Sequence, residues 1–290
     1  YGKPGMSRKI VDTYLMADGS RFTDKPGYET MEFAEQVSGR DPRLAQTMRT
    51  PGFKRIDSDV TEPLRLNFSV TGYHITKYVH SINAGADTYG RSYNDLPIFR
   101  TAEVYLNFAE AKAELGTISN SDWAQTIGAL RARAGITAGL DAVPTVKDPL
   151  LVEYYGDLSA AVLEVRRERA IELMLEGHRQ IDLKRWALGE LWETMPWEGV
   201  YVPALDTQLD MNGDGVMDVY FTEKSADEIS AEDGKIAAYL NENQTMRKLE
   251  DDPKGGYVMY YAYGDRRVWN DNMYLYPIPT QVGVMNPNLV

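Results

Sequence analysis

The sequence contains no cysteine, only three histidines and no long run of apolar residues. The absence of cysteine excludes disulfides, thiolate nucleophiles and cysteine-ligated metal sites. No apolar stretch approaches the roughly 20 residues that a membrane-spanning helix needs, so we expect no transmembrane segment. Acidic residues outnumber basic ones, 43 against 31, and the formal net charge is -12. Nucleic acid is therefore an unfavourable partner, because phosphate binding requires clustered Lys and Arg.

Sequence motifs of the common enzyme classes are also missing. His74, His80 and His178 belong to no HExxH motif, and no Gly-x-Ser-x-Gly, Walker A or GxGxxG sequence is present. His178 lies between two predicted helices in EGHRQID, a setting typical of a hydrogen-bonded packing residue. A glycosidase with two converging carboxylates stays open as a weaker alternative, since any two of the 43 acids could meet in space. The sequence favours a protein that is not an enzyme.

The chain has enough residues for one large domain with a substantial core. Up to about residue 97 it is rich in Gly, Pro, Asp and Thr, which predicts loops and short elements. From Arg100 onwards, apolar residues recur three and four apart in four segments, at 100–116, 121–135, 159–177 and 179–192, which predicts two helical hairpins. The predicted apolar stripes are Ala102, Leu106, Ala109 and Ala113; Trp123, Ile127, Leu130 and Ala134; Leu163, Ala170, Ile171 and Met174; and Leu183, Trp186, Ala187 and Leu191.

Residues with capping ability mark the ends of these segments. Ser121 is placed to begin the second helix, and Gly116, Gly135 and Gly177 are placed to end the first three. From residue 195 to 220 the sequence is irregular. One further helix is predicted over 234–249, and the aromatic and proline-containing residues from 255 onwards are expected to form an extended tail over the helices.

Residues 210–218 read DMNGDGVMD, which matches most of an EF-hand-type calcium loop. Gly215 stands at the sixth position, where the turn requires it, and the donors are all oxygen, which suits Ca²⁺. The twelfth position is Phe221 in place of a bidentate glutamate, so Glu223 or a distant carboxylate would complete the shell. A single unpaired loop predicts a structural ion, with a metal-free turn as the alternative. The predicted ligands are Asp210, Asn212, Asp214, the carbonyl of Val216, and Asp218.

Aromatic residues are abundant for a helical protein, with 19 Tyr and 5 Trp, and many stand in predicted loops. Aromatic rings near Asp, Asn and Arg suit sugars, which present an apolar C–H face and a rim of hydroxyls. Burial beneath a loop is the alternative role for any one of them. Our candidates for ligand contact are Tyr28, Phe53, Tyr89 and Trp197.

The charged run EVRRERAIELMLEG, at 164–177, raises the question of an anion site. Pairing along the helix explains it without a ligand. Glu164 and Arg167, like Arg169 and Glu172, stand three residues apart and are expected to form ion pairs on a solvent-facing or inter-helix surface.

Three motifs in this order resemble the C-terminal region of the SusD/RagB family, the surface lipoproteins of outer-membrane nutrient-uptake systems. They are RTAEVYLNFAEAKAELG, RERAIELMLEGHRQIDLKRW and YLYPIPTQVGVMNPNL, and the resemblance extends over the whole chain from KIVDTYLMADGS. Ala170 replaces the family's second Arg in the second motif. The matching positions of that motif are Glu168, Arg169, Glu172, Leu173, Glu176, Gly177, His178, Arg179, Asp182, Leu183, Arg185 and Trp186.

This resemblance implies a mainly α-helical fold of tetratricopeptide-like hairpins with long irregular loops. Residues 1–290 would be the C-terminal SusD/RagB-type domain, and the family's N-terminal helices and lipid anchor would lie outside this sequence. The implied role is non-catalytic glycan binding at the cell surface of the outer membrane, with delivery to a SusC-like TonB-dependent transporter. Some family members carry a calcium loop where GDGVMD stands here. A peptide-binding member of the family is the main alternative, and a glycan-degrading enzyme is less favoured.

Overall fold

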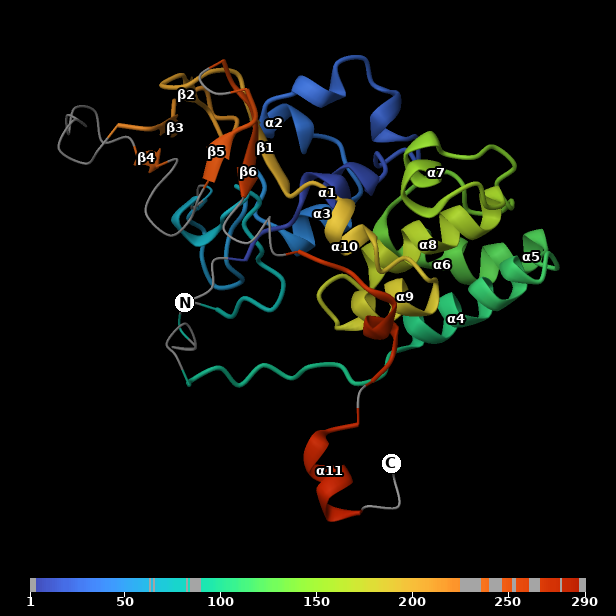
Figure 1. Ribbon diagram of the computed structural model, residues 1–290. Helices are drawn as coiled ribbons and strands as arrows, with labels where there is room; N and C mark the ends of the chain where they lie inside the picture. Colours follow the sequence, from blue (N-terminus) through green and yellow to red (C-terminus); the bar gives the residue numbers. More distant parts are fainter. Residues whose placement is uncertain are drawn as a thin grey trace.

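The computed structural model describes residues 4–62, 64, 66–81, 83, 90–224, 236–239, 247–251, 254–260, 267–276 and 278–286. Figure 1 shows the helices α4 to α9 on one side of the molecule, the strands on the other, and α1 to α3 between them. No helix among these residues has the length and apolar character that crossing a bilayer requires.

The first predicted hairpin is confirmed. Helix α4 (Thr101–Glu114) ends before Gly116, whose φ of +65° is the left-handed conformation that glycine adopts without strain. Its partner is one helical segment in three parts, α5 (Asn120–Trp123), a π-helical turn η5 (Ala124–Gly128) and α6 (Ala129–Ala134). Ser119, rather than Ser121, caps its start, because the Ser119 side chain and Asp122 form a reciprocal capping box. Both predicted stripes are buried against each other and against α8.

Helix α8 (Ala160–Glu172) occupies the centre of this helical half, packed on α4 and α7 (Pro149–Tyr155) (Figure 1). Every one of its residues is buried, including its six charged side chains Glu164, Arg166, Arg167, Glu168, Arg169 and Glu172. The chain then turns at Gly177 into α9 (His178–Arg185) and, after a further turn, α10 (Leu191–Thr194). The stripe predicted for this last segment is only half-buried, and Ala187 is exposed.

Two three-stranded sheets occupy segments that we predicted to be irregular, helical or, for residues 256–260, part of an extended tail. The first has the order β1-β6-β5, with β1 (Glu198–Val202) antiparallel to β6 (Gly256–Tyr260), which is antiparallel to β5 (Arg247–Leu249). The second has the order β2-β3-β4, in which β2 (Gln208–Leu209) is antiparallel and β4 (Ile236–Tyr239) parallel to β3 (Val219–Thr222).

The helix predicted over 234–249 is therefore wrong, since the described parts of that segment, β4 and β5, are strands. The irregular reading of 195–220 is also wrong where β1, β2 and β3 lie. These strands are two to five residues long, and each obtains its backbone hydrogen bonds from a strand elsewhere in the sequence. Local periodicity carries no information about such a partner.

The described residues among the first hundred form loops and short elements, as predicted. A core joins this part to the sheets, with Val11, Tyr14 and Tyr73 packed in one cluster with Val200 and Phe221. The segment after α3 crosses beneath the sheets and runs as an extended chain towards α4 (Figure 1). The elements are α1 (Arg8–Thr13), η1 (Phe22–Asp24), η2 (Tyr28–Thr30), α2 (Phe33–Gln36), α3 (Pro42–Thr47) and η3 (Leu66–Phe68).

The tail contains a single helical turn, η8 (Asp271–Tyr274), and a helix, α11 (Thr280–Met285). Among the described residues of the predicted tail, only 267–276 lie over the helices as expected, because 256–260 form β6 of the first sheet. The Tyr274 hydroxyl accepts a hydrogen bond from the Gly189 N–H at 2.9 Å, and Arg267 donates to the Met195 carbonyl at 2.8 Å. Helix α11 projects away from these contacts (Figure 1).

Candidate functional site

A cavity of about 640 Å³ opens beside Phe53, and we call it the Phe53 cavity. After α3 the chain turns at Gly52, whose φ is +82°, and the Phe53 N–H donates to the Thr50 carbonyl at 3.1 Å. Glycine suits this left-handed position because it has no Cβ. The turn places residues 50–56 as one wall. Residues 45–46 from α3, Thr76 and residues 79–80 supply the rest.

The Phe53 ring is held from behind by charged side chains. The Arg49 guanidinium lies 4.6 Å from the ring centre, and Arg49 forms an ion pair with Glu62 at 3.0 Å. The Glu62 N–H in turn donates to the Phe53 carbonyl at 2.9 Å. The half-buried ring also lines the cavity. A fixed aromatic surface next to polar groups can take the apolar side of a ligand.

A second aromatic surface surrounds Trp197, the residue before β1. The rings of Trp197 and Tyr260 are parallel, with centres 5.9 Å apart and an interplanar angle of 2°. Trp192 meets Trp197 edge-on at 5.7 Å, and the Arg267 guanidinium lies 4.8 Å from the Trp197 ring centre. Trp192 is 53% exposed, whereas Trp197 is half-buried by these neighbours. Trp192, which we did not select from the sequence, is thus the more accessible ring.

The remaining aromatic candidates differ in their surroundings. Tyr28 is the first residue of η2 and packs edge-on against Phe22 at 5.7 Å, while its carbonyl accepts a hydrogen bond from Arg8 at 2.7 Å. Burial, and then the charge of Glu29, raise the pKa of Tyr28. Tyr89 lies outside the described residues. In the described part of the chain no ring contact joins Tyr28, Phe53 and Trp197, so they do not form one shared platform.

The loop 210–218 forms a closed turn around Asp210. Its carboxylate accepts hydrogen bonds from the N–H groups of Gly213 at 2.6 Å and Gly215 at 2.7 Å. Gly215 has a φ of +83°, the conformation for which a glycine is needed at the sixth position. The Asp218 carboxylate accepts from the Met211 N–H at 2.9 Å. The turn thus has the backbone shape that the calcium pattern predicts.

The charges of this loop repel one another. Burial, and then the negative charges of Asp210 and Asp214, raise the pKa of Asp218 against the opposing effect of its backbone hydrogen bonds. A cation would relieve this repulsion, and the donor set of carboxylate, amide and carbonyl oxygens suits Ca²⁺. Across the described residues, however, no three His, Asp or Glu side chains converge closely enough to hold a metal. Binding would therefore require the loop's carboxylates to turn towards a common point.

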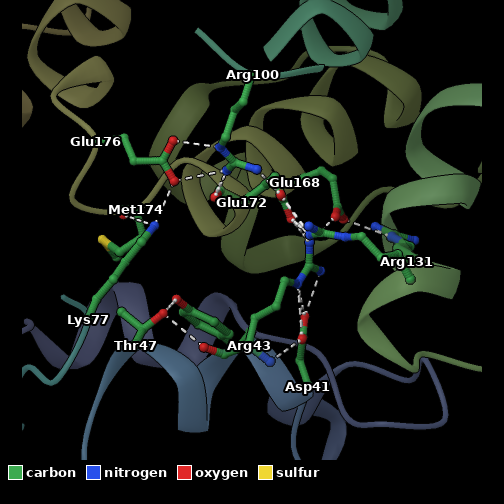
Figure 2. Close-up of polar contacts among 12 residues, drawn as sticks. Asp41, Arg43, Thr47, Lys77, Arg100, Arg131, Glu168, Glu172, Met174 and Glu176 are labelled. Atoms are coloured by element: carbon green, nitrogen blue, oxygen red, sulfur yellow. Dashed lines mark hydrogen bonds and ion pairs between the residues drawn. The ribbon is translucent and has the colours of Figure 1, made fainter. Parts of the chain in front are cut away.

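The charged side chains of α8 form a buried ion-pair network, and Figure 2 shows its centre. Arg43 of α3 points up to Glu168 and Glu172 of α8, and also pairs with Asp41 at 2.7 Å. Arg131 of α6 reaches the other oxygen of Glu168 at 2.9 Å. Glu168 is 0% exposed, so it lies between two guanidinium groups away from water. Burial alone would raise the pKa of Glu168, but Arg43 and Arg131 overcome it and lower the pKa below its usual value.

The same network reaches the start of α4 and the loop before it. Arg100 pairs with Glu172 and Glu176, each at 2.6 Å, and Lys77 pairs with Glu176 at 2.7 Å (Figure 2). Carboxylates of the second motif therefore join α8 to α3, to α6 and to the long segment between α3 and α4. Each buried charge named in this network is paired, as desolvation requires.

The predicted ion pairs within α8 are right for one pair and wrong for the other. Arg167 does pair with Glu164 at 2.8 Å. Arg169 instead pairs with Asp182 of α9 at 2.7 Å, while Glu172 is taken by Arg43, Arg100 and Arg133. Because α8 is buried on all sides, its charges face neighbouring elements, and tertiary partners replace the expected local one.

The three histidines lie at separate places. His74 stacks on Phe68 with ring centres 5.9 Å apart, and His80 packs on Tyr93 at 4.6 Å. His178 begins α9, with Nδ1 at 3.8 Å from Glu103. A second cavity, of about 500 Å³, lies between the start of the chain and α8 and α9. It is lined largely by apolar side chains such as Met6, Ile10 and Leu173.

Comparison with known proteins identifies the family. A sequence model of the SusD family matches residues 1–290, and the chain belongs to this family. Among solved structures, a SusD-like carbohydrate-binding protein from Bacteroides fragilis is 21% identical with a TM-score of 0.53, covering 98% of this chain and 48% of its own. A SusD-like protein from the same organism is also 21% identical, with a TM-score of 0.57 and coverage of 98% and 45%. No curated protein matches the chain.

These structures share the mainly α-helical fold that the sequence predicted. The chain spans just under half the length of each of them. At this identity the likeness concerns the fold, and the ligand-facing residues have to be argued from this chain.

Proposed function

We propose that this protein binds an oligosaccharide or polysaccharide at the bacterial cell surface, without catalysis, and delivers it to a SusC-like TonB-dependent transporter of the outer membrane. The observation that carries the proposal is the Phe53 cavity, in which an aromatic ring selected from the sequence lies beside polar side chains in a space of about 640 Å³. Membership of the SusD family supports it, as does the carbohydrate-binding description of one structural neighbour.

The cavity suits a few sugar residues in size and chemistry. Ligand sites in proteins typically occupy about 300–1,000 Å³ and combine apolar surface with a small number of polar groups. Phe53, Pro51 and Val79 supply apolar surface, and Gln46 and Thr50 supply hydrogen-bonding groups. A pyranose has the matching features, an apolar C–H face and a rim of hydroxyls.

A binding panel tests this proposal against its two alternatives. The 290-residue chain is run by affinity electrophoresis through gels containing different polysaccharides, and a peptide panel is measured by calorimetry. Retardation by at least one glycan, with no peptide bound, is expected. Tight binding of peptides alone would favour a peptide-binding member of the family. Release of shorter glycans during incubation would show that the protein is an enzyme.

Replacing the ring tests the site itself. Stacking on aromatic residues contributes substantially to binding, so Phe53→Ala should weaken glycan binding at least tenfold while the melting temperature changes little. Phe108→Ala is a matched control, because Phe108 is an exposed phenylalanine on α4. Tyr28→Ala and Trp197→Ala test the other two described candidates. If all three variants at candidate positions bind normally, or if each melts early, these rings are packing residues.

For the loop 210–218 we propose a structural Ca²⁺ ion held by Asp210, Asn212, Asp214, the Val216 carbonyl and Asp218. The closed turn and the positive φ of Gly215 support it. The ion would neutralise these charges and fix the loop between β2 and β3. It would take no part in ligand chemistry.

A further inference from the structure

The charged residues that line the Phe53 cavity are both basic. Lys54 and Arg55 are in its wall, and no Asp or Glu is among the described residues that line it. Of the two, Arg55 lies 3.7 Å from Glu62, a carboxylate behind the ring that is paired with Arg49 at 3.0 Å. Lys54 is exposed and has no carboxylate among the described residues within ion-pair distance. A basic wall is notable on a chain whose net charge is -12.

Two buried polar atoms in the same wall have no hydrogen-bond partner among the described residues. Thr76 is only 7% exposed, yet its Oγ1 is unpartnered. His80 Nε2 is the second such atom, on a ring fixed by contact with Tyr93. Buried polar atoms in native proteins are normally hydrogen-bonded, and those that are not call for a physical reason. A hydroxyl-bearing ligand in the cavity would satisfy both once the two side chains turn towards it, because neither atom is exposed to solvent.

The backbone fixes these groups in relation to each other. The Thr76 N–H donates to the Thr47 carbonyl of α3 at 2.9 Å, and Arg55 donates to the His80 carbonyl at 3.4 Å. The two walls of the cavity are therefore tied together on either side of the Phe53 ring. The cavity combines an aromatic face, two polar atoms without a protein partner, and two cations.

We infer that the Phe53 cavity selects a saccharide that carries an anionic group, a carboxylate or a sulfate. Lys54 and Arg55 hold the anionic group, Thr76 and His80 hydrogen-bond to hydroxyls, and Phe53 stacks on the C–H face of the ring. Arginine and lysine are the usual partners of such oxyanions. This inference rests on the proposed glycan-binding function and specifies the class of its ligand.

Matched pairs of ligands test the inference by calorimetry on the 290-residue chain. An oligogalacturonide is compared with its fully methyl-esterified form, and a sulfated oligosaccharide with its desulfated form. At least one charged member should bind ten or more times as tightly as its neutral counterpart, and raising the salt from about 50 to 500 mM should reduce this preference. The pair that shows the preference identifies the anionic group.

Two variants assign the preference to this cavity. Lys54→Gln should reduce the charged-over-neutral affinity ratio at least threefold, because it removes a positive charge that the charged member uses more than the neutral one. Thr76→Val keeps the shape of the side chain and removes the unpartnered hydroxyl. This variant should weaken the binding of both the charged and the neutral ligand of a pair without lowering the melting temperature. Lys254→Gln, between β5 and β6, is the matched control, because Lys254 is likewise exposed, and it should change neither value.

The outcomes separate this inference from the proposed function. Equal binding of charged and neutral members, or an unchanged ratio in Lys54→Gln, overturns the anionic preference while glycan binding stands. Failure to bind any glycan overturns the proposed function itself. Tighter binding of an oligoglutamate than of every charged sugar overturns the inference in favour of acidic peptides.

Discussion

Glu168 carries a charge at a position that water does not reach, and Arg43 and Arg131 bind one oxygen each. Replacing a buried pair by apolar residues can be neutral, but removing one partner leaves the others unpaired. Two guanidinium groups, from α3 and α6 respectively, share this one carboxylate, although Arg43 also pairs with Asp41 and Glu172, and Arg131 with Glu164. The residue that the sequence presents as part of a helical charge run is therefore a junction between three elements.

Glu168→Gln should destabilise the protein. The amide keeps the size of the side chain but removes its charge, which leaves Arg43 and Arg131 insufficiently neutralised. We expect the free energy of unfolding to fall by roughly 3 kcal/mol, at the lower end for breaking a buried ion pair. Denaturant titration measures it. Glu114→Gln is the control, since Glu114 also pairs with an arginine but is 46% exposed, and should cost less than about 0.5 kcal/mol.

The same substitution should alter the response to acid. Nearby Arg and Lys side chains outweigh burial and hold the pKa values of Glu164, Glu168 and Glu176 below the ordinary glutamate value. The unfolded chain therefore takes up protons at a higher pH than the folded one. Stability from these groups is complete above the unfolded pKa, near 4.5, and is lost as the pH falls through the lower folded values. The wild-type protein should lose stability steeply below about pH 4.5, and Glu168→Gln less steeply. Curves of the free energy of unfolding against pH that run parallel for the wild type and Glu168→Gln would contradict this prediction.

At the scale of elements, the short strands and the loop between two of them depend on each other. Strands β2 and β3 pair on either side of residues 210–218, and the Asp218 N–H donates to the Leu209 carbonyl at 2.8 Å. Met211 of this loop is 3% exposed and belongs to the central core cluster. Fixing the loop therefore also fixes part of the core beneath it.

Calcium should stabilise the protein through this loop. An ion that binds only the folded state raises the melting temperature by mass action, and EDTA should lower it again. A crystal structure with calcium should show six to eight oxygen ligands at about 2.3–2.6 Å.

Asp214→Ala should abolish the response to EDTA and leave glycan affinity nearly intact, because the ion is assigned to loop architecture. Loss of glycan binding in this variant with no change in melting temperature would place the ion in the binding site instead. A melting temperature that never responds to calcium or EDTA would show that the turn is metal-free.

At the scale of the whole molecule, the Phe53 cavity and the Trp197 surface lie outside the buried helical hairpin, in the loop and strand part of the chain. The helices supply a rigid frame, held together by α8 and its ion pairs. Loops joined to such a frame can present ligand-binding groups without contributing to the core. The proposed binding residues and the scaffold residues thus lie in different parts of the described chain.

The proposed partnership predicts how the protein behaves in cells. Delivery of a glycan to a transporter requires a persistent interface, so the full-length protein should co-purify with a TonB-dependent barrel from outer membranes solubilised in mild detergent. Mass spectrometry of the purified complex identifies the barrel. Recovery from the cytoplasm, or as a free monomer under the same conditions, would count heavily against the partnership.

The sequence alone determined the features that depend on neighbouring residues. Apolar residues three and four apart specify α4 and α8, Gly116 follows the end of α4, and Gly135 ends α6, because these signals act within one or two turns. The tight turn at 210–218 is likewise local, since Asp210 bonds to N–H groups within its own loop. The composition also allowed Phe53 to be selected as a candidate.

Tertiary structure decided everything that depends on distant partners. Glu172 stands three residues from Arg169, yet pairs with Arg43, Arg100 and Arg133, because burial of α8 places those side chains within reach. Strands β1 and β6 form because each supplies the other's backbone hydrogen bonds. Thr76 joins the wall of the Phe53 cavity only when the two segments fold together. No local pattern encodes these contacts, since their free energy is gained only when remote segments meet.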